Sequence, residues 1–176
     1  EEVGEAIAAS GVKRAEIFLV TKVARDNLGP RNFIHSVKDS LELLATDYVD
    51  LLLIHWPPEE RHLDAAIEAL CEAYDLKLTR AIGVSNFTIP LLKQAVARSR
   101  HPIVNNQVEF HPMIDQSRLA AAAKELGVAL SAYAPLARGA ALKEKAVIDA
   151  AQRLGRPPAE IVLRWIVQQG VIALPM

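Results

Sequence analysis

The chain has a single cysteine, Cys71, and no long apolar run. Each of these scarcities excludes certain classes of protein. One thiol excludes an internal disulfide and a CxxC redox pair. No stretch approaches the roughly 20 apolar residues that span a bilayer, and no segment has the pattern of a signal peptide. A net charge of -1 over 176 residues gives no electrostatic reason to expect nucleic acid or an anionic membrane as a partner. Together these features favour the reducing cytoplasm.

The motifs of several enzyme classes are also missing. No GxGxxG occurs, so the Rossmann dinucleotide fingerprint is absent. There is no HExxH, and the five histidines lack metal-ligand spacing, so we predict no metal site. Glu109 is the only carboxylate near the strand ends described below. A glycosidase that needs paired carboxylates would therefore lack its second acid.

What the chain does have is a recurring unit, a short apolar segment that runs into a polar, aromatic or turn-forming residue. Six such segments are expected to be strands: residues 17–20, 49–54, 81–84, 103–106, 128–132 and 171–174. Amphipathic helical segments separate them, such as the apolar stripe within residues 33–44. Two helices in succession are expected at about 142–154 and 158–169. Strands connected by helices in this way are parallel.

This alternation predicts an α/β fold, specifically a partial (β/α)8 TIM barrel comprising roughly strands 3 to 8. The length of the repeated unit favours a barrel over a doubly wound sheet. No linker interrupts the pattern, so residues 1–176 should form one incomplete domain. Six parallel strands cannot close an eight-stranded barrel, and we therefore expect a fragment that lacks the N-terminal strands and the C-terminal helix and loop.

In a parallel βα array the C-terminal ends of the strands share one face, and that face holds the active site. The residues expected there are Lys22, His55, Ser85, Asn86, Gln107 and Tyr133. Lys22 is either a solvated loop lysine or a partly buried ammonium that lowers the pKa of a neighbouring phenol. His55 is either structural or a neutral imidazole that donates a hydrogen bond to a substrate carbonyl. Trp56 is either an apolar wall of the pocket or an aromatic residue that closes the barrel rim.

The remaining polar strand ends have the same two interpretations. Ser85 and Asn86 precede a helix and can simply cap it, and Gln107 can satisfy a turn. As a group, their hydroxyl and amide atoms also suit a planar carboxamide ligand. Tyr133 can pack the barrel rim or stack on a flat ring.

Four segments carry a resemblance to a known family. Residues 47–57 (DYVDLLLIHWP), 80–87 (RAIGVSNF), 106–112 (NQVEFHP) and 133–136 (YAPL) resemble aldo-keto reductase signatures, in the order that the family has them. The likeness extends over essentially the whole chain. Within the family the sequence is most similar to bacterial 2,5-diketo-D-gluconate reductases.

The resemblance implies NADPH-dependent reduction of aldehydes or ketones, such as 2,5-diketo-D-gluconate or methylglyoxal-like carbonyls, to alcohols. By motif match, Lys22 and His55 look like two of the four catalytic residues of the family, whose tyrosine and aspartate should lie before Glu1. Ser85, Asn86 and Gln107 would bind the nicotinamide carboxamide and Tyr133 would stack on its ring. Leu136 and Arg138 would border the pyrophosphate, and Trp56 would contact the substrate.

The same likeness implies a small carbonyl compound as partner and a monomer when the protein is complete. Residues 1–176 alone should be inactive. The resemblance, and not any residue of this sequence, implies NADP(H) rather than NAD(H), because the stretch that binds the 2′-phosphate normally follows the last strand and is expected to be missing here. Two alternatives remain open: a non-catalytic, nucleotide-binding member of the same fold, and a lyase or aldolase that uses Lys22 as a Schiff-base nucleophile.

Overall fold

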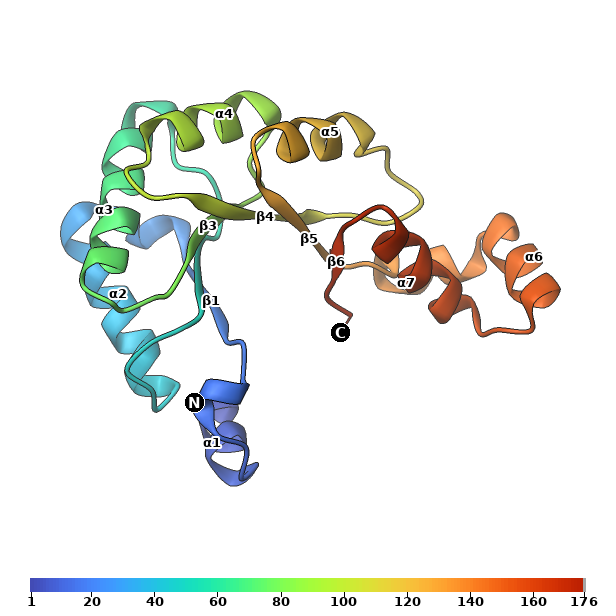
Figure 1. Cartoon of the computed structure of the whole chain (residues 1–176), viewed down its shortest axis with the longest axis horizontal. Helices are drawn as coiled ribbons and strands as arrows, with labels where there is room; N and C mark the ends of the chain where they lie inside the picture. The colour runs from blue at the N-terminus through green and yellow to red at the C-terminus, as the bar shows by residue number, and fades with distance from the viewer. Residues whose placement is uncertain (176) are drawn as a thin grey trace. The chain divides into compact units, whose positions relative to one another are not determined.

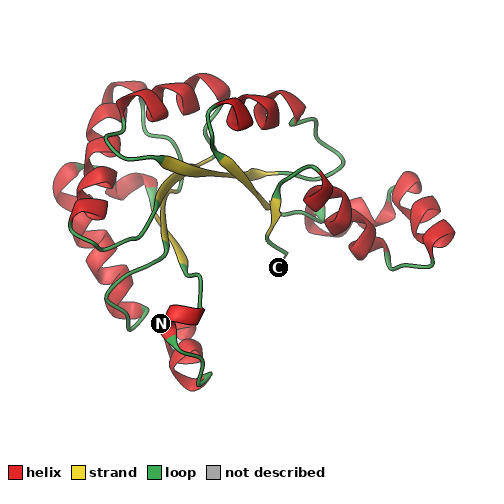
Figure 2. Cartoon of the chain, in the orientation of Figure 1, coloured by secondary structure: helices red, strands yellow, loops and turns green. Residues whose placement is uncertain are grey.

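The structure is a computed structural model that describes residues 1–175 in two compact units, residues 1–104 and 105–175. Each unit alternates strands with helices, as Figure 2 shows. The first contains α1 (Glu2–Ala9), β1 (Val20–Val23), α2 (Pro30–Leu43), β2 (Leu51–Ile54), α3 (Leu63–Asp75), β3 (Ile82–Ser85) and α4 (Ile89–Arg98). The second contains α5 (Ser117–Glu125), β5 (Ala129–Tyr133), α6 (Lys145–Leu154), α7 (Pro158–Gln168) and β6 (Ile172–Ala173). Strand β4 (Ile103–Glu109) begins just before the boundary between the units.

All the strand pairs within the units are parallel, which confirms the predicted α/β class. In the first unit β2 lies between β1 and β3, and in the second unit β5 lies between β4 and β6. Every residue of β2 is buried, as expected of a strand covered on both faces. Figure 1 shows α2 and α3 along the same side of the first three strands. The prediction that residues 1–176 form one domain stays a prediction.

The helices form where the apolar periodicity places them. In α2, Phe33, Val37 and Leu41 are the buried residues, and Pro30 occupies the first turn, where its missing N–H costs nothing. The pair α6 and α7 matches the two successive helices that the sequence indicates, and Gly155 ends α6 in the left-handed conformation. Among residues 1–175, no helix has both the length and the apolar character needed to cross a membrane.

The first strand begins later than predicted, at Val20 rather than at residue 17. The reason is a side chain: the backbone N–H of Leu19 donates to the Asp50 carboxylate at 2.9 Å instead of to a neighbouring strand. Phe18 is mostly exposed. The strand continues to Val23, so Lys22 lies within β1 and not in the loop after it.

Candidate active site

Lys22 and His55 lie at the same end and on the same face of the β1–β2 pair. Lys22 is in register with Leu53, and the His55 N–H continues the ladder by donating to the Val23 carbonyl at 3.0 Å. His55 is two residues beyond Leu53, and alternate residues of a strand share a face. The structure therefore brings these two predicted residues together.

The electrostatics of the two side chains are coupled. Burial lowers the pKa of the Lys22 ammonium, because a charged group loses hydration there. Burial is also the main reason that the pKa of His55 is lowered, and the positive charge of Lys22 lowers it further. Both effects favour a neutral imidazole at neutral pH. A neutral His55 can donate one hydrogen bond from a ring nitrogen to an uncharged oxygen acceptor.

The end of β3 is hydrogen-bonded to the backbone of His55. Ser85 is the last residue of that strand and is buried, and Asn86 follows it with a φ of 63°. Asparagine tolerates this left-handed conformation better than most residues. The Asn86 side-chain amide donates to the His55 carbonyl at 3.0 Å and to the Ser85 hydroxyl oxygen at 3.1 Å. Asn86 thus fixes the backbone of His55 as well as lying beside it.

Trp56, the predicted substrate contact, is 48% exposed directly after His55. Its indole ring is therefore accessible to a small molecule while the backbone follows the fully buried β2. This exposure fits either interpretation of the residue, a pocket wall or an aromatic residue at the rim.

In the second unit, Gln107 and Tyr133 share a face of the β4–β5 pair. Gln107 is in register with Ser131, and Glu109 with Tyr133, so the side chains of all four residues lie on one side. Gln107 is buried. Burial raises the pKa of Tyr133, and the charge of Glu109 raises it further; a backbone hydrogen bond at Glu109 and the charge of Arg138 act in the opposite direction.

The loop after Tyr133 is tightly turned. Three consecutive residues, Ala137, Arg138 and Gly139, have positive φ angles of 49°, 52° and 90°. The Gly139 N–H donates to the Leu136 carbonyl at 2.9 Å, which closes the turn. The Arg138 side chain is exposed. Leu136 and Arg138 therefore flank one compact turn, the place where the resemblance puts the pyrophosphate.

The available side chains have the chemistry that a nicotinamide needs. A carboxamide has one acceptor and two donor positions, and the Ser85 hydroxyl and the side-chain amides of Asn86 and Gln107 carry both kinds of atom. Tyr133 offers a flat ring for stacking. Lys22, His55, Ser85 and Asn86 come together within the first unit, and Gln107 and Tyr133 within the second. That all six meet at one barrel mouth stays a prediction.

Sequence reasoning missed a charged cluster at the opposite end of the first three strands. Asp50 is 5% exposed and forms ion pairs with Arg14 at 2.9 Å and with Arg80 at 3.1 Å. The two guanidinium groups also lie over the Tyr48 ring, each 4.2 Å from its centroid. One signal was available in the sequence: a lone acid inside the apolar segment 49–54 requires a partner, because a buried charge without one is costly.

The comparisons with known proteins agree along the whole chain. The model of the aldo/keto reductase family matches residues 1–176. The methylglyoxal reductase DkgB of Escherichia coli O157:H7 is 42% identical over 98% of the chain. A crystal structure provisionally named a 2,5-diketo-D-gluconic acid reductase B has a TM-score of 0.96 and 43% identity over 99% of the chain. An aldo-keto reductase of Bombyx mori in complex with NADP has a TM-score of 0.89 and 31% identity, again over 99%. The chain spans 66%, 62% and 64% of these proteins, respectively.

Proposed function

Because this chain belongs to the aldo/keto reductase family, we propose that the protein containing it reduces an aldehyde or ketone to an alcohol with NADPH. The observation that carries this proposal is the pairing of Lys22 with His55 on one face of β1–β2, where burial and, after it, the lysine charge lower the pKa of the imidazole. NADPH, when bound, supplies the hydride that the carbonyl carbon accepts.

Residues of this chain bind and orient the carbonyl oxygen of the substrate. Neutral His55 donates a hydrogen bond to that oxygen and orients the carbonyl. By the family resemblance, the oxygen receives its proton from a tyrosine phenol. A free phenol titrates near 10, and the Lys22 ammonium would bring its pKa toward neutrality. Lys22 is partly buried, so its charge is screened less by water than that of a surface lysine.

The cofactor would be held by polar groups at the strand ends. Ser85, Asn86 and Gln107 bind the carboxamide, Tyr133 stacks on the ring, and Leu136 and Arg138 border the pyrophosphate. The Bombyx mori reductase with NADP supports the choice of NADP(H).

For the substrate we propose a small dicarbonyl compound, of the methylglyoxal or 2,5-diketo-D-gluconate kind, with Trp56 as one wall of its site. The names of the bacterial methylglyoxal reductase and of the provisionally named diketogluconate reductase support this class. We also propose that the chain supplies strands 3 to 8 of a single (β/α)8 barrel domain, in a protein that is a cytoplasmic monomer. The TM-score of 0.96 over 99% of the chain supports the barrel.

The test is NADPH oxidation by the full-length protein with methylglyoxal as the substrate. We expect turnover that Lys22→Met lowers by roughly 10²–10⁴ and that the surface variant Lys38→Met leaves unchanged. Cofactor binding without turnover would indicate a nucleotide-binding protein instead. Covalent trapping of a carbonyl compound on Lys22 by borohydride would indicate a Schiff-base lyase.

A further inference from the structure

Glu109 and His111, at the end of β4, form a pair that the proposed mechanism does not use. The His111 Nε2 atom lies 3.2 Å from the Glu109 Oε1 atom. His111 is only 5% exposed, whereas the Glu109 side chain is about half exposed. The His111 Nδ1 atom is buried and has no hydrogen-bond partner among the described residues.

These contacts assign the proton of a neutral imidazole. A buried N–H without an acceptor is costly, so the proton belongs on Nε2, where the Glu109 carboxylate accepts it. His111 in this tautomer holds the carboxylate in one orientation and leaves its negative charge in place. The Gln116 side chain donates to the Glu109 backbone carbonyl at 3.1 Å and fixes the main chain at the same point.

The carboxylate is held beside Tyr133. The two residues are register partners on neighbouring parallel strands and share a face of the β4–β5 pair. The charge of Glu109 acts on the Tyr133 phenol. After burial, it is the second cause of the raised pKa of Tyr133, and its effect is larger than the opposing effect of the Arg138 charge. At the Tyr133 phenol the charge of Glu109 thus outweighs that of Arg138.

We propose that Glu109, positioned by His111, stabilises the oxidised nicotinamide relative to the reduced one. This inference rests on the proposed function, in which Tyr133 stacks on the nicotinamide. The reduced ring is neutral, and it becomes cationic as it gives up hydride. A fixed carboxylate next to its stacking partner favours the cationic form and the transition state that leads to it. Glu109 therefore adjusts the redox balance of the bound cofactor without contacting the substrate.

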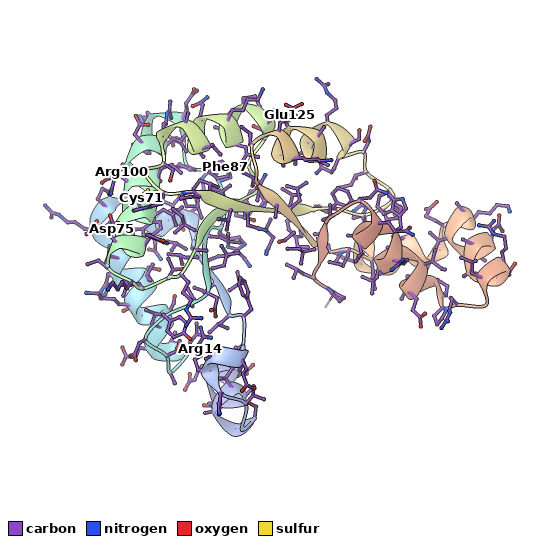
Figure 3. The ribbon with its side chains drawn as sticks, viewed as in Figure 1. Arg14, Cys71, Asp75, Phe87, Arg100 and Glu125 are labelled. Carbon is purple, nitrogen blue, oxygen red and sulfur yellow. The ribbon has the colours of Figure 1, made fainter. Side chains whose placement is uncertain are left out.

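The test compares the affinities of the full-length protein for NADP+ and NADPH, measured by fluorescence titration at low salt. Glu109→Gln keeps the shape of the side chain and removes the charge. We expect it to weaken NADP+ binding about fivefold and to change NADPH binding less than twofold, which raises the potential of the bound couple by about 20 mV. Glu109→Asp should retain most of the preference for NADP+. Glu125→Gln, on α5 in the same unit (Figure 3), removes an exposed carboxylate as a matched control and should change neither affinity.

Equal changes in both affinities for Glu109→Gln, or no change, would overturn the inference and leave Glu109 and His111 as a structural pair at the strand end. If the wild-type protein binds neither form of the cofactor, the proposed function fails and this inference fails with it. The two failures are therefore distinguishable by the wild-type titration alone.

Discussion

The polar side chains at the two ends of strands β1, β2 and β3 differ in whether a carboxylate neutralises the basic groups. At the N-terminal end, the Asp50 carboxylate is satisfied by Arg14, Arg80 and the Leu19 N–H (Arg14 is labelled in Figure 3). At the C-terminal end, Lys22 and His55 lie together without a carboxylate among the causes of their shifted pKa values. Burial raises the pKa of Asp50, but the hydrogen bond from the Leu19 N–H, followed by the hydrogen bond and charge of Arg14 and the charge of Arg80, holds it below its usual value.

Under the proposed function, one end of these strands holds residues that stabilise the fold and the other end holds residues that act on the substrate. A buried acid with two basic partners and a backbone donor has its hydrogen-bonding capacity filled and cannot easily take part in a reaction. A partly buried lysine beside a histidine has its charge state set by the protein and remains able to polarise a ligand. In parallel βα arrays this division is general, with catalysis at the C-terminal ends and stability at the other.

The largest expected effect is on turnover. Lys22→Met in the full-length protein should lower kcat by roughly 10²–10⁴, the range typical of losing acid–base assistance. NADPH affinity should change far less, because Lys22 acts on the phenol rather than on the cofactor. Steady-state kinetics and a cofactor titration measure the two effects separately. Equal losses in kcat and cofactor affinity would make Lys22 a structural residue and remove the contrast between the two ends.

The next effect is on stability. Asp50→Ala leaves two arginines without their partner and should destabilise the full-length protein by about 3 kcal/mol, near the lower end for breaking a buried ion pair. Chemical denaturation measures it, and kcat of the folded variant should stay near that of the wild type. Asp47→Ala, an exposed acid nearby, is the matched control and should change stability by less than about 0.5 kcal/mol.

The difference in stability between the wild type and Asp50→Ala should decrease as the pH falls. Because the folded-state pKa of Asp50 lies below the unfolded value of 3.8, its stabilising contribution is present above pH 3.8 and is lost as the pH falls through the folded-state pKa. The wild type and Asp50→Ala should therefore converge in stability in strong acid. A difference that persists undiminished there would show that packing, and not charge, accounts for the effect of Asp50.

The smallest effect concerns the turn between α3 and the N-terminal end of β3. Lys77 follows α3 with a φ of 59°, a conformation in which a side chain is strained. Lys77→Gly should stabilise the protein by about 0.5–1 kcal/mol, because relief of this strain exceeds the entropy that glycine adds to the unfolded chain. Lys77→Ala, which keeps the Cβ atom, should show no such gain in thermal denaturation. Neither variant should alter turnover.

The sequence predicted the parts that depend on local pattern. The apolar segments, the helix stripes and the polar residues after each strand were sufficient to place Lys22 and His55 on neighbouring parallel strands, and the family assignment is confirmed. The start of β1 was wrong because the Asp50 side chain takes the Leu19 N–H, a contact between residues 31 positions apart. The Arg14–Asp50–Arg80 cluster was missed for the same reason, since ion pairs across strands leave no periodic trace. The Glu109–His111 pair was missed because its significance depends on strand register with Tyr133.

The most direct test of the central claim is an NMR titration of the His55 ring in the full-length protein, with and without Lys22→Met. In the wild type the pKa of His55 should lie below its ordinary value of 6.5, because burial and the lysine charge both oppose protonation. Methionine keeps much of the burial and removes the charge, so the pKa should rise part of the way back. An unchanged pKa in the variant would show that the ammonium and the imidazole do not interact, and the proposed division between the two strand ends would be contradicted.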